Sequence, residues 1–121
     1  MNNEDEIIIG TLPNCNNAIQ VFIHKQDICT IPHFHIRRTT KYTQKWECTI
    51  SLHKNDYLKH IGICNKTIHN RDTKKLDIFL RQFNGKDIHC RTFWQILIDT
   101  WNFYNDNKFP IDYTQPNYDR L

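Results

Sequence analysis

The sequence has few of the residues on which several common kinds of active site depend. It has three glycines in 121 residues, so it offers no glycine-rich loop that would wrap a phosphate group. Its single serine, Ser51, lies outside any G-x-S-x-G motif, which argues against a serine hydrolase. No apolar run approaches the ~18 residues of a membrane span, and the acidic start MNNEDEIIIG does not resemble a signal peptide. We therefore predict no membrane association and a cytoplasmic location.

The cysteines form no recognisable pattern. They are odd in number and widely spaced, without a C-x-x-C motif: Cys15, Cys29, Cys48, Cys64 and Cys90. A disulfide framework or a zinc ribbon needs paired or regularly spaced cysteines. We therefore predict reduced thiols, as is usual in a cytoplasm, with Cys48 buried and unreactive.

The chain does contain enough apolar residues for one folded domain. Hydrophobic residues make up 39% and aromatic residues 12% of the chain, which predicts one core and a single domain over 1–121. Only the ends, 1–6 and roughly 108–121, are expected to be loosely structured. The formal net charge of +3 is small and the basic residues are scattered, so charge alone does not indicate a nucleic-acid-binding protein.

Alternation of apolar and polar residues predicts strands in the first half of the chain. Segment 46–53, WECTISLH, is the clearest case, because its apolar and polar side chains face opposite sides of an extended chain. Segments 18–25 and 33–38 show the same period of two, and 7–12 is predicted to be a short strand. Pro32 restricts Ile31 to an extended conformation.

Two amphipathic helices are predicted after the strands. In 72–83 the apolar residues recur at helical spacing, with Asp72 as N-cap: Leu76, Phe79, Leu80 and Phe83. In 92–106, Thr92 and Gln95 form a possible capping box. We therefore predict an α+β fold, with a small antiparallel sheet of three to four strands and two C-terminal helices packed on one face.

The segment IPHFHIRR, 31–38, supplies the candidate functional residues. Side chains alternate along a strand, so Phe34 should face the core while the histidines on either side of it face away. Polar residues of the strand at 46–53 should lie on the same outer face. The candidate binding residues gathered there are His33, His35, Arg37, Glu47 and His53.

Three kinds of chemistry are compatible with this outer face. His33 and His35, two positions apart, are candidate ligands for a metal ion such as zinc, with Glu47, His53 or Cys29 as a third ligand. A histidine and a glutamate within reach of each other would also suit acid–base catalysis. Arginines and histidines would suit binding of phosphates or of an acidic protein surface. Two ordinary surface histidines would produce the same pattern, and the sequence does not require any cofactor.

The motif PHFHI at 32–36 resembles the P-P-H-F-H-V motif of a family of short proteins from gut bacteria and their phages. The resemblance covers roughly 32–121, through CTISLHKNDYLKH, KKLDIFL, WQILIDTWNFYND and QPNYDRL. Ile31 stands where that motif has its first proline. The resemblance implies a mobile-element or phage context, in which small proteins are often antitoxin-like, regulatory or directed against host defence.

We therefore predict a small cytoplasmic protein of a bacterial or phage mobile element that acts by binding a protein or nucleic-acid partner. The outer face with His33 and His35 is its predicted binding surface. The alternative is a metal-dependent or histidine-based nuclease-like enzyme that uses the same face.

Overall fold

The computed structural model describes residues 5–12, 19–25, 32–38, 46–53, 56–61, 70–105 and 113–117. Within these residues, five strands form one antiparallel sheet whose spatial order is the chain order. The elements are β1 (Glu6–Leu12), β2 (Ile19–His24), β3 (His33–Arg38), β4 (Trp46–Ser51), β5 (His60–Ile61), α1 (Asn70–Arg81) and α2 (Phe93–Tyr104). The predicted α+β class, with an antiparallel sheet followed by two helices, is confirmed.

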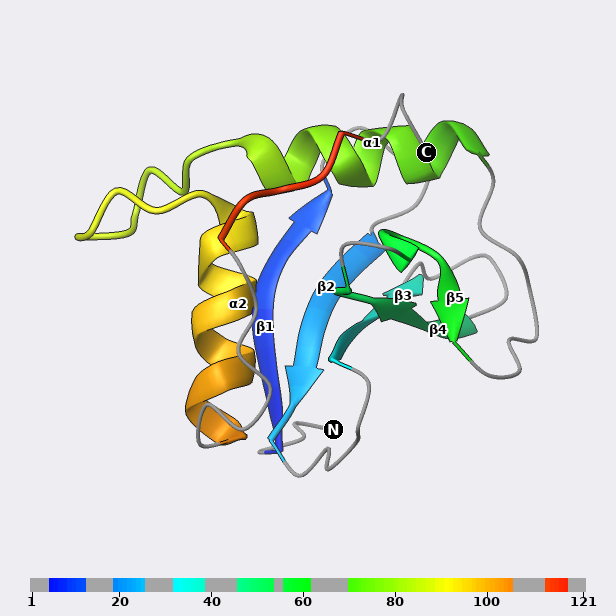
Figure 1. The fold of residues 1–121 in the computed structure, drawn as a ribbon, viewed down its shortest axis with the longest axis horizontal. Coiled ribbons are helices and arrows are strands. Elements are labelled where there is room, and N and C mark those ends of the chain that lie inside the picture. Colours follow the sequence, from blue (N-terminus) through cyan, green and yellow to red (C-terminus); the bar gives the residue numbers. More distant parts are fainter. Residues whose placement is uncertain are drawn as a thin grey trace.

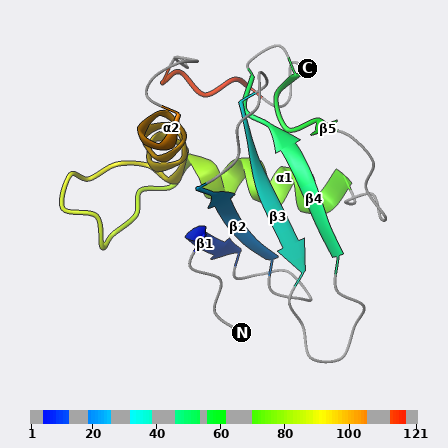
Figure 2. The ribbon, with the colours of Figure 1, turned by 90° about the horizontal axis from the view of Figure 1, so that it is seen from below.

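The two helices are arranged differently around the sheet. Figure 1 shows α2 running beside β1, while α1 crosses near one end of the sheet. In Figure 2, which views the molecule from below, α1 lies behind β2, β3 and β4. The short strand β5 was not predicted, because two residues are too few to show a period. It extends the sheet through the pairs Thr49↔Ile61 and Ile50↔His60.

The hydrophobic core lies between one face of the sheet and the helices. The sheet contributes alternate residues of its three central strands: Ile19, Val21, Ile23, Phe34, Ile36, Cys48 and Ile50. The helices contribute Leu76, Phe79, Leu80, Trp94, Leu97, Ile98 and Trp101. All of these side chains are buried, so the predicted inward side of 33–38 and of 48–52 is confirmed.

Gly10 in β1 lets Phe79 of α1 approach the sheet closely. The pairing of β1 with β2 shifts between Ile8 and Gly10. A Cβ atom at Gly10 would lie 2.5 Å from Cζ of Phe79, well inside van der Waals contact, so the missing side chain provides the space. Phe79 in turn stacks on Phe93 with ring centroids 4.2 Å apart, which joins α1 to α2 over β1.

The N-terminus of α2 has the predicted capping box. The Thr92 hydroxyl accepts a hydrogen bond from the backbone N–H of Gln95 at 3.2 Å, and the Gln95 side-chain oxygen accepts one from the N–H of Thr92 at 3.0 Å. These two bonds satisfy backbone donors that have no partner within the helix.

The bounds of α1 differ from the predicted ones. The helix begins at Asn70, so Asp72 lies inside it and is not its N-cap. It ends at Arg81, and Phe83 pairs with Thr92 in an isolated bridge. Phe83 is therefore 69% exposed, and its predicted place on the buried face of the helix was wrong. The segment between the helices projects from the rest of the molecule (Figure 1).

A buried polar network joins distant segments of the chain. The Tyr57 hydroxyl donates to the Asp77 carboxylate of α1 at 2.5 Å, and Gln115 Nε2 donates to the Tyr57 oxygen at 2.6 Å. Trp94 Nε1 donates to the backbone oxygen of Tyr113 at 3.0 Å. These bonds hold residues 113–117, part of the C-terminal end that was expected to be loose, against both helices.

The cysteines correct one expectation. Of the two cysteines in the described residues, Cys90 is free and exposed, whereas Cys48 is buried, as predicted, and disulfide-bonded. The prediction of reduced thiols is therefore wrong for Cys48. The helices in the described part of the chain are too short or too polar to cross a membrane.

Candidate metal centre

The sheet face opposite the core carries mostly polar side chains. Across β3 and β4, Arg37 pairs with Glu47 and His35 pairs with Thr49. Across β2 and β3, Phe22 pairs with His35. Because paired residues share a face of the sheet, these side chains lie together on what we call the histidine face. It includes Gln20, Phe22, His24, His33, His35, Arg37, Glu47 and Thr49.

Four of the five predicted binding residues lie on the histidine face, and the fifth does not join them. His33, His35, Arg37 and Glu47 follow the predicted alternation. His53 lies beyond the end of β4, is exposed, and donates its backbone N–H to the Ser51 hydroxyl at 3.0 Å. Cys29, considered as a third ligand, lies outside the described residues.

The two histidines of the PHFH motif are not surface residues. His33 and His35 are only 6% and 8% exposed, so the expectation of a solvated histidine pair was wrong. The ring of His33 lies edge-on between the rings of His35 and Trp101, with centroid distances of 5.1 and 4.9 Å. Alternation along the strand determines which way each ring points, but it does not determine whether that side is open to water.

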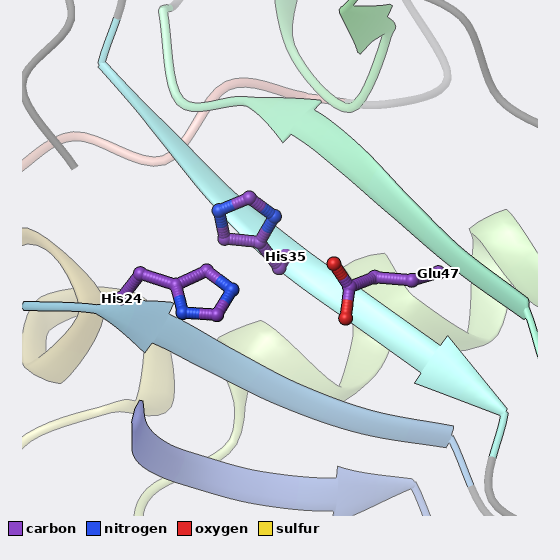
Figure 3. Close-up of side chains that lie close together, drawn as sticks. All are labelled: His24, His35 and Glu47. Carbon is purple, nitrogen blue, oxygen red and sulfur yellow. The ribbon is translucent and has the colours of Figure 1, made fainter. Parts of the chain in front are cut away.

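The structure brings together a set of metal ligands that differs from the predicted pair. Nitrogen or oxygen atoms of His24, His35 and Glu47 all lie within 4.8 Å of one another. Figure 3 shows these side chains reaching toward one another from β2, β3 and β4, with α1 on the far side of the sheet. Each of three adjacent strands therefore supplies one ligand. Among the described residues this is the only cluster of three such groups.

The upper bound on the separation of these atoms can be compared with what a bound ion requires. With zinc–ligand bonds of ~2.0–2.2 Å, atoms in a tetrahedral arrangement lie about 3.4 Å apart. The upper bound of 4.8 Å exceeds this value by about 1.4 Å at most, a distance that side-chain rotation can close. Glu47 is exposed whereas His35 is buried, so fewer packed neighbours restrict the rotation of the Glu47 side chain.

Neighbouring groups orient His35. The Thr49 hydroxyl oxygen lies 3.3 Å from His35 Nδ1, and Phe22 stacks on the imidazole with centroids 5.4 Å apart. When Nδ1 carries the ring proton, it donates to Thr49, and Nε2 is then the ring nitrogen that carries a lone pair. Such a partner on the second ring nitrogen is typical of metal-binding histidines.

His24 is the ligand that the sequence-based prediction missed. The period of two in 18–25 assigns it to the side opposite Ile19, Val21 and Ile23, and the structure confirms this side. Its proximity to His35 depends on the β2–β3 register, which no local pattern reveals. In the structure the two imidazole rings meet edge-on, 4.5 Å apart between centroids.

A separate pocket of about 310 Å³ lies between α2 and β1. Its charged residue Arg91 is already bound, because it donates two hydrogen bonds to Asp87 and one to Asp99, each 2.9 Å long. The bonds with Asp87 hold the pKa of that carboxyl well below its ordinary value and raise the pKa of the guanidinium. This network stabilises the segment between the helices. It also uses all three guanidinium nitrogens of Arg91 as donors to Asp87 and Asp99.

No protein-family model, curated protein sequence or solved structure matches this chain. The chemistry of the histidine face is therefore argued from its own side chains.

Proposed function

We propose that this protein binds a divalent transition-metal ion, preferentially zinc, through His24, His35 and Glu47. The observation that supports this function is the convergence of three ligand atoms from three adjacent strands within 4.8 Å. The contact between Thr49 and His35 adds support, because it holds the buried imidazole in one orientation.

The ligand types favour zinc over the alkaline-earth ions. Imidazole nitrogen with one carboxylate is a ligand set of zinc and of ferrous iron. Magnesium and calcium prefer oxygen ligands alone. Structural zinc sites are closed by four protein ligands, whereas catalytic sites have three and keep a position for water or substrate. A centre with three protein ligands thus suits hydrolytic chemistry, in which the metal activates a bound water.

This proposal favours the enzyme alternative over binding alone. A metal-dependent, nuclease-like enzyme that uses the histidine face accommodates both the His24–His35–Glu47 cluster and its open coordination position. Binding of a protein or nucleic-acid partner in a bacterial or phage cytoplasm stays a prediction, as does the resemblance to the PHFH[VI] family.

The experiment is a titration of metal-free protein with Zn²⁺ by isothermal calorimetry, with Mg²⁺ in parallel. We expect one Zn²⁺ per chain and no Mg²⁺ binding at comparable concentrations. Losing a second-sphere partner costs about 10–100-fold in affinity, so His24→Gln and Glu47→Gln, which remove a ligand, should cost at least as much. Thr49→Val should cause a smaller loss.

The matched control is His53→Gln, which removes an exposed histidine outside the cluster. It should leave zinc affinity unchanged. Binding that is equally strong in His24→Gln and His53→Gln, or no binding by the wild-type protein, would contradict the proposal.

A further inference from the structure

Arg37 lies next to the candidate metal centre and is held in place by neighbours. It pairs with Glu47 across β3 and β4 and lies two positions from His35 on the same strand face. Its Nη1 donates to Glu6 at 2.7 Å and its Nε donates to Gln20 at 3.0 Å. The guanidinium carbon also lies 4.3 Å from the centroid of the Phe22 ring. The group is therefore ordered before any ligand arrives.

Two of the three guanidinium nitrogens of Arg37 have acceptors among the described residues. Within the described part of the chain, Nη2 of Arg37 has no hydrogen-bond acceptor, and the side chain is 27% exposed. Phe22 connects the guanidinium to the ligands, because its ring also contacts His24 and His35, with centroid distances of 5.2 and 5.4 Å. Free donors and the candidate metal centre thus border the same ring.

The charges near the loaded centre favour an anion. Glu6 offsets the charge of Arg37 through an ion pair, and Glu47 offsets only one of the two charges of a divalent ion. The loaded centre therefore keeps a net positive charge next to an open coordination position. An arginine side chain matches phosphate oxygens in geometry as well as charge.

We infer that the metal-loaded centre binds a phosphate group, with one oxygen on the metal ion and another accepting a hydrogen bond from Arg37 Nη2. The substrate class is then a phosphate ester. The inference rests on the proposed metal centre and adds to it the group that the open position accepts. Arg37 acts as a binding residue that orients the phosphate, and Glu6 and Gln20 hold Arg37.

The test uses the cobalt-substituted full-length protein, because Co²⁺ can replace zinc at nitrogen and oxygen sites and absorbs visible light. Inorganic phosphate is titrated at low concentration into protein that carries one Co²⁺, and the visible spectrum is recorded, with acetate titrated separately. We expect a saturable spectral change with phosphate and a much weaker one with acetate. Arg37→Gln should raise the apparent Kd for phosphate at least tenfold, and Arg37→Lys should raise it less.

The matched control is Arg38→Gln, which makes the same charge change at the next residue of β3, on the opposite face. It should leave phosphate binding unchanged, and cobalt should bind to all variants with the same stoichiometry. Arg37→Lys keeps the charge and is available if Arg37→Gln fails to fold.

The possible failures can be distinguished. A wild-type protein that develops no cobalt spectrum overturns the metal centre and the phosphate inference together. A normal cobalt spectrum that phosphate does not change overturns the phosphate inference alone. Equal phosphate affinity in Arg37→Gln and Arg38→Gln, or equal affinity for acetate and phosphate, overturns the role given to Arg37.

Discussion

Among single residues, Tyr57 has a protonation state closely connected with folding. Two effects raise the pKa of Tyr57 well above its ordinary value of 10.0: burial of the side chain is the larger, and the hydrogen bond to Asp77 is the second. The folded state thus binds the phenol proton more tightly than the unfolded state. A group with a raised folded-state pKa contributes stability that is complete below the unfolded-state pKa. This stability is lost progressively as the pH rises above about 10.

Replacing Tyr57 with phenylalanine should therefore have a pH-dependent effect. At pH 7 we expect Tyr57→Phe to lower the free energy of unfolding by about 1.5–3 kcal/mol, the usual range for a hydrogen bond to a charged group. Above pH 10 the difference from the wild type should narrow, because only the wild type loses stability through this group. Urea denaturation at pH 7 and at pH 10.5–11 measures both values. A difference that widens at high pH would mean that the pKa of Tyr57 is lower in the folded protein than in the unfolded chain.

At the scale of elements, α1 shows how the end of a helix decides which apolar residues are buried. Leu76 and Leu80 face the core together with Phe79, which is 6% exposed. Phe83 would continue the same stripe if the helix ran one turn further. Because α1 ends at Arg81, the backbone turns away and the Phe83 ring lies at the surface.

Two matched substitutions test this assignment. Phe79→Ala should lower the free energy of unfolding by roughly 3–5 kcal/mol, because it leaves a cavity beside Gly10 and Phe93. Phe83→Ala removes the same atoms from an exposed position and should change it by less than about 0.5 kcal/mol. Chemical denaturation of both variants measures the two changes in the free energy of unfolding. Similar losses for the two would indicate that α1 extends to Phe83 as the sequence suggests.

At the scale of the whole molecule, the disulfide at Cys48 adds a covalent link to the noncovalent packing of the core. Cys48 is 2% exposed and lies among the core residues of β4. A disulfide inside a buried core constrains the unfolded chain as well as packing in the folded one.

Reduction should therefore destabilise the protein. A native disulfide typically contributes ~2–4 kcal/mol, which for a chain of this size corresponds to a melting temperature lower by roughly 10 °C. Thermal unfolding with and without reductant measures the difference. The Cys90→Ala variant should still melt at a lower temperature in reductant, because Cys90 is free. The melting temperature of Cys48→Ala should not depend on reductant, because this variant lacks the disulfide. An unchanged melting temperature in reductant would restore the prediction of reduced thiols.

The features that the sequence alone determined are those that depend on residues close together in the chain. The period of two placed Phe34 and Ile36 in the core and their histidine neighbours on the other face. The Thr92–Gln95 capping box placed the start of α2 correctly. Backbone geometry sets these relations over a few residues, so they can be read without knowledge of the rest of the fold.

Only the tertiary structure decided which side chains meet across the sheet. His24 and Glu47 approach His35 because the strands pair in one particular register, and a slip of one residue would turn each of them to the other face. The burial of His33 and His35 and the disulfide at Cys48 likewise depend on groups distant in the chain. Such contacts are set by the packing of the whole domain. For that reason the sequence indicated the face on which the candidate metal centre lies, but not the set of ligands that forms it.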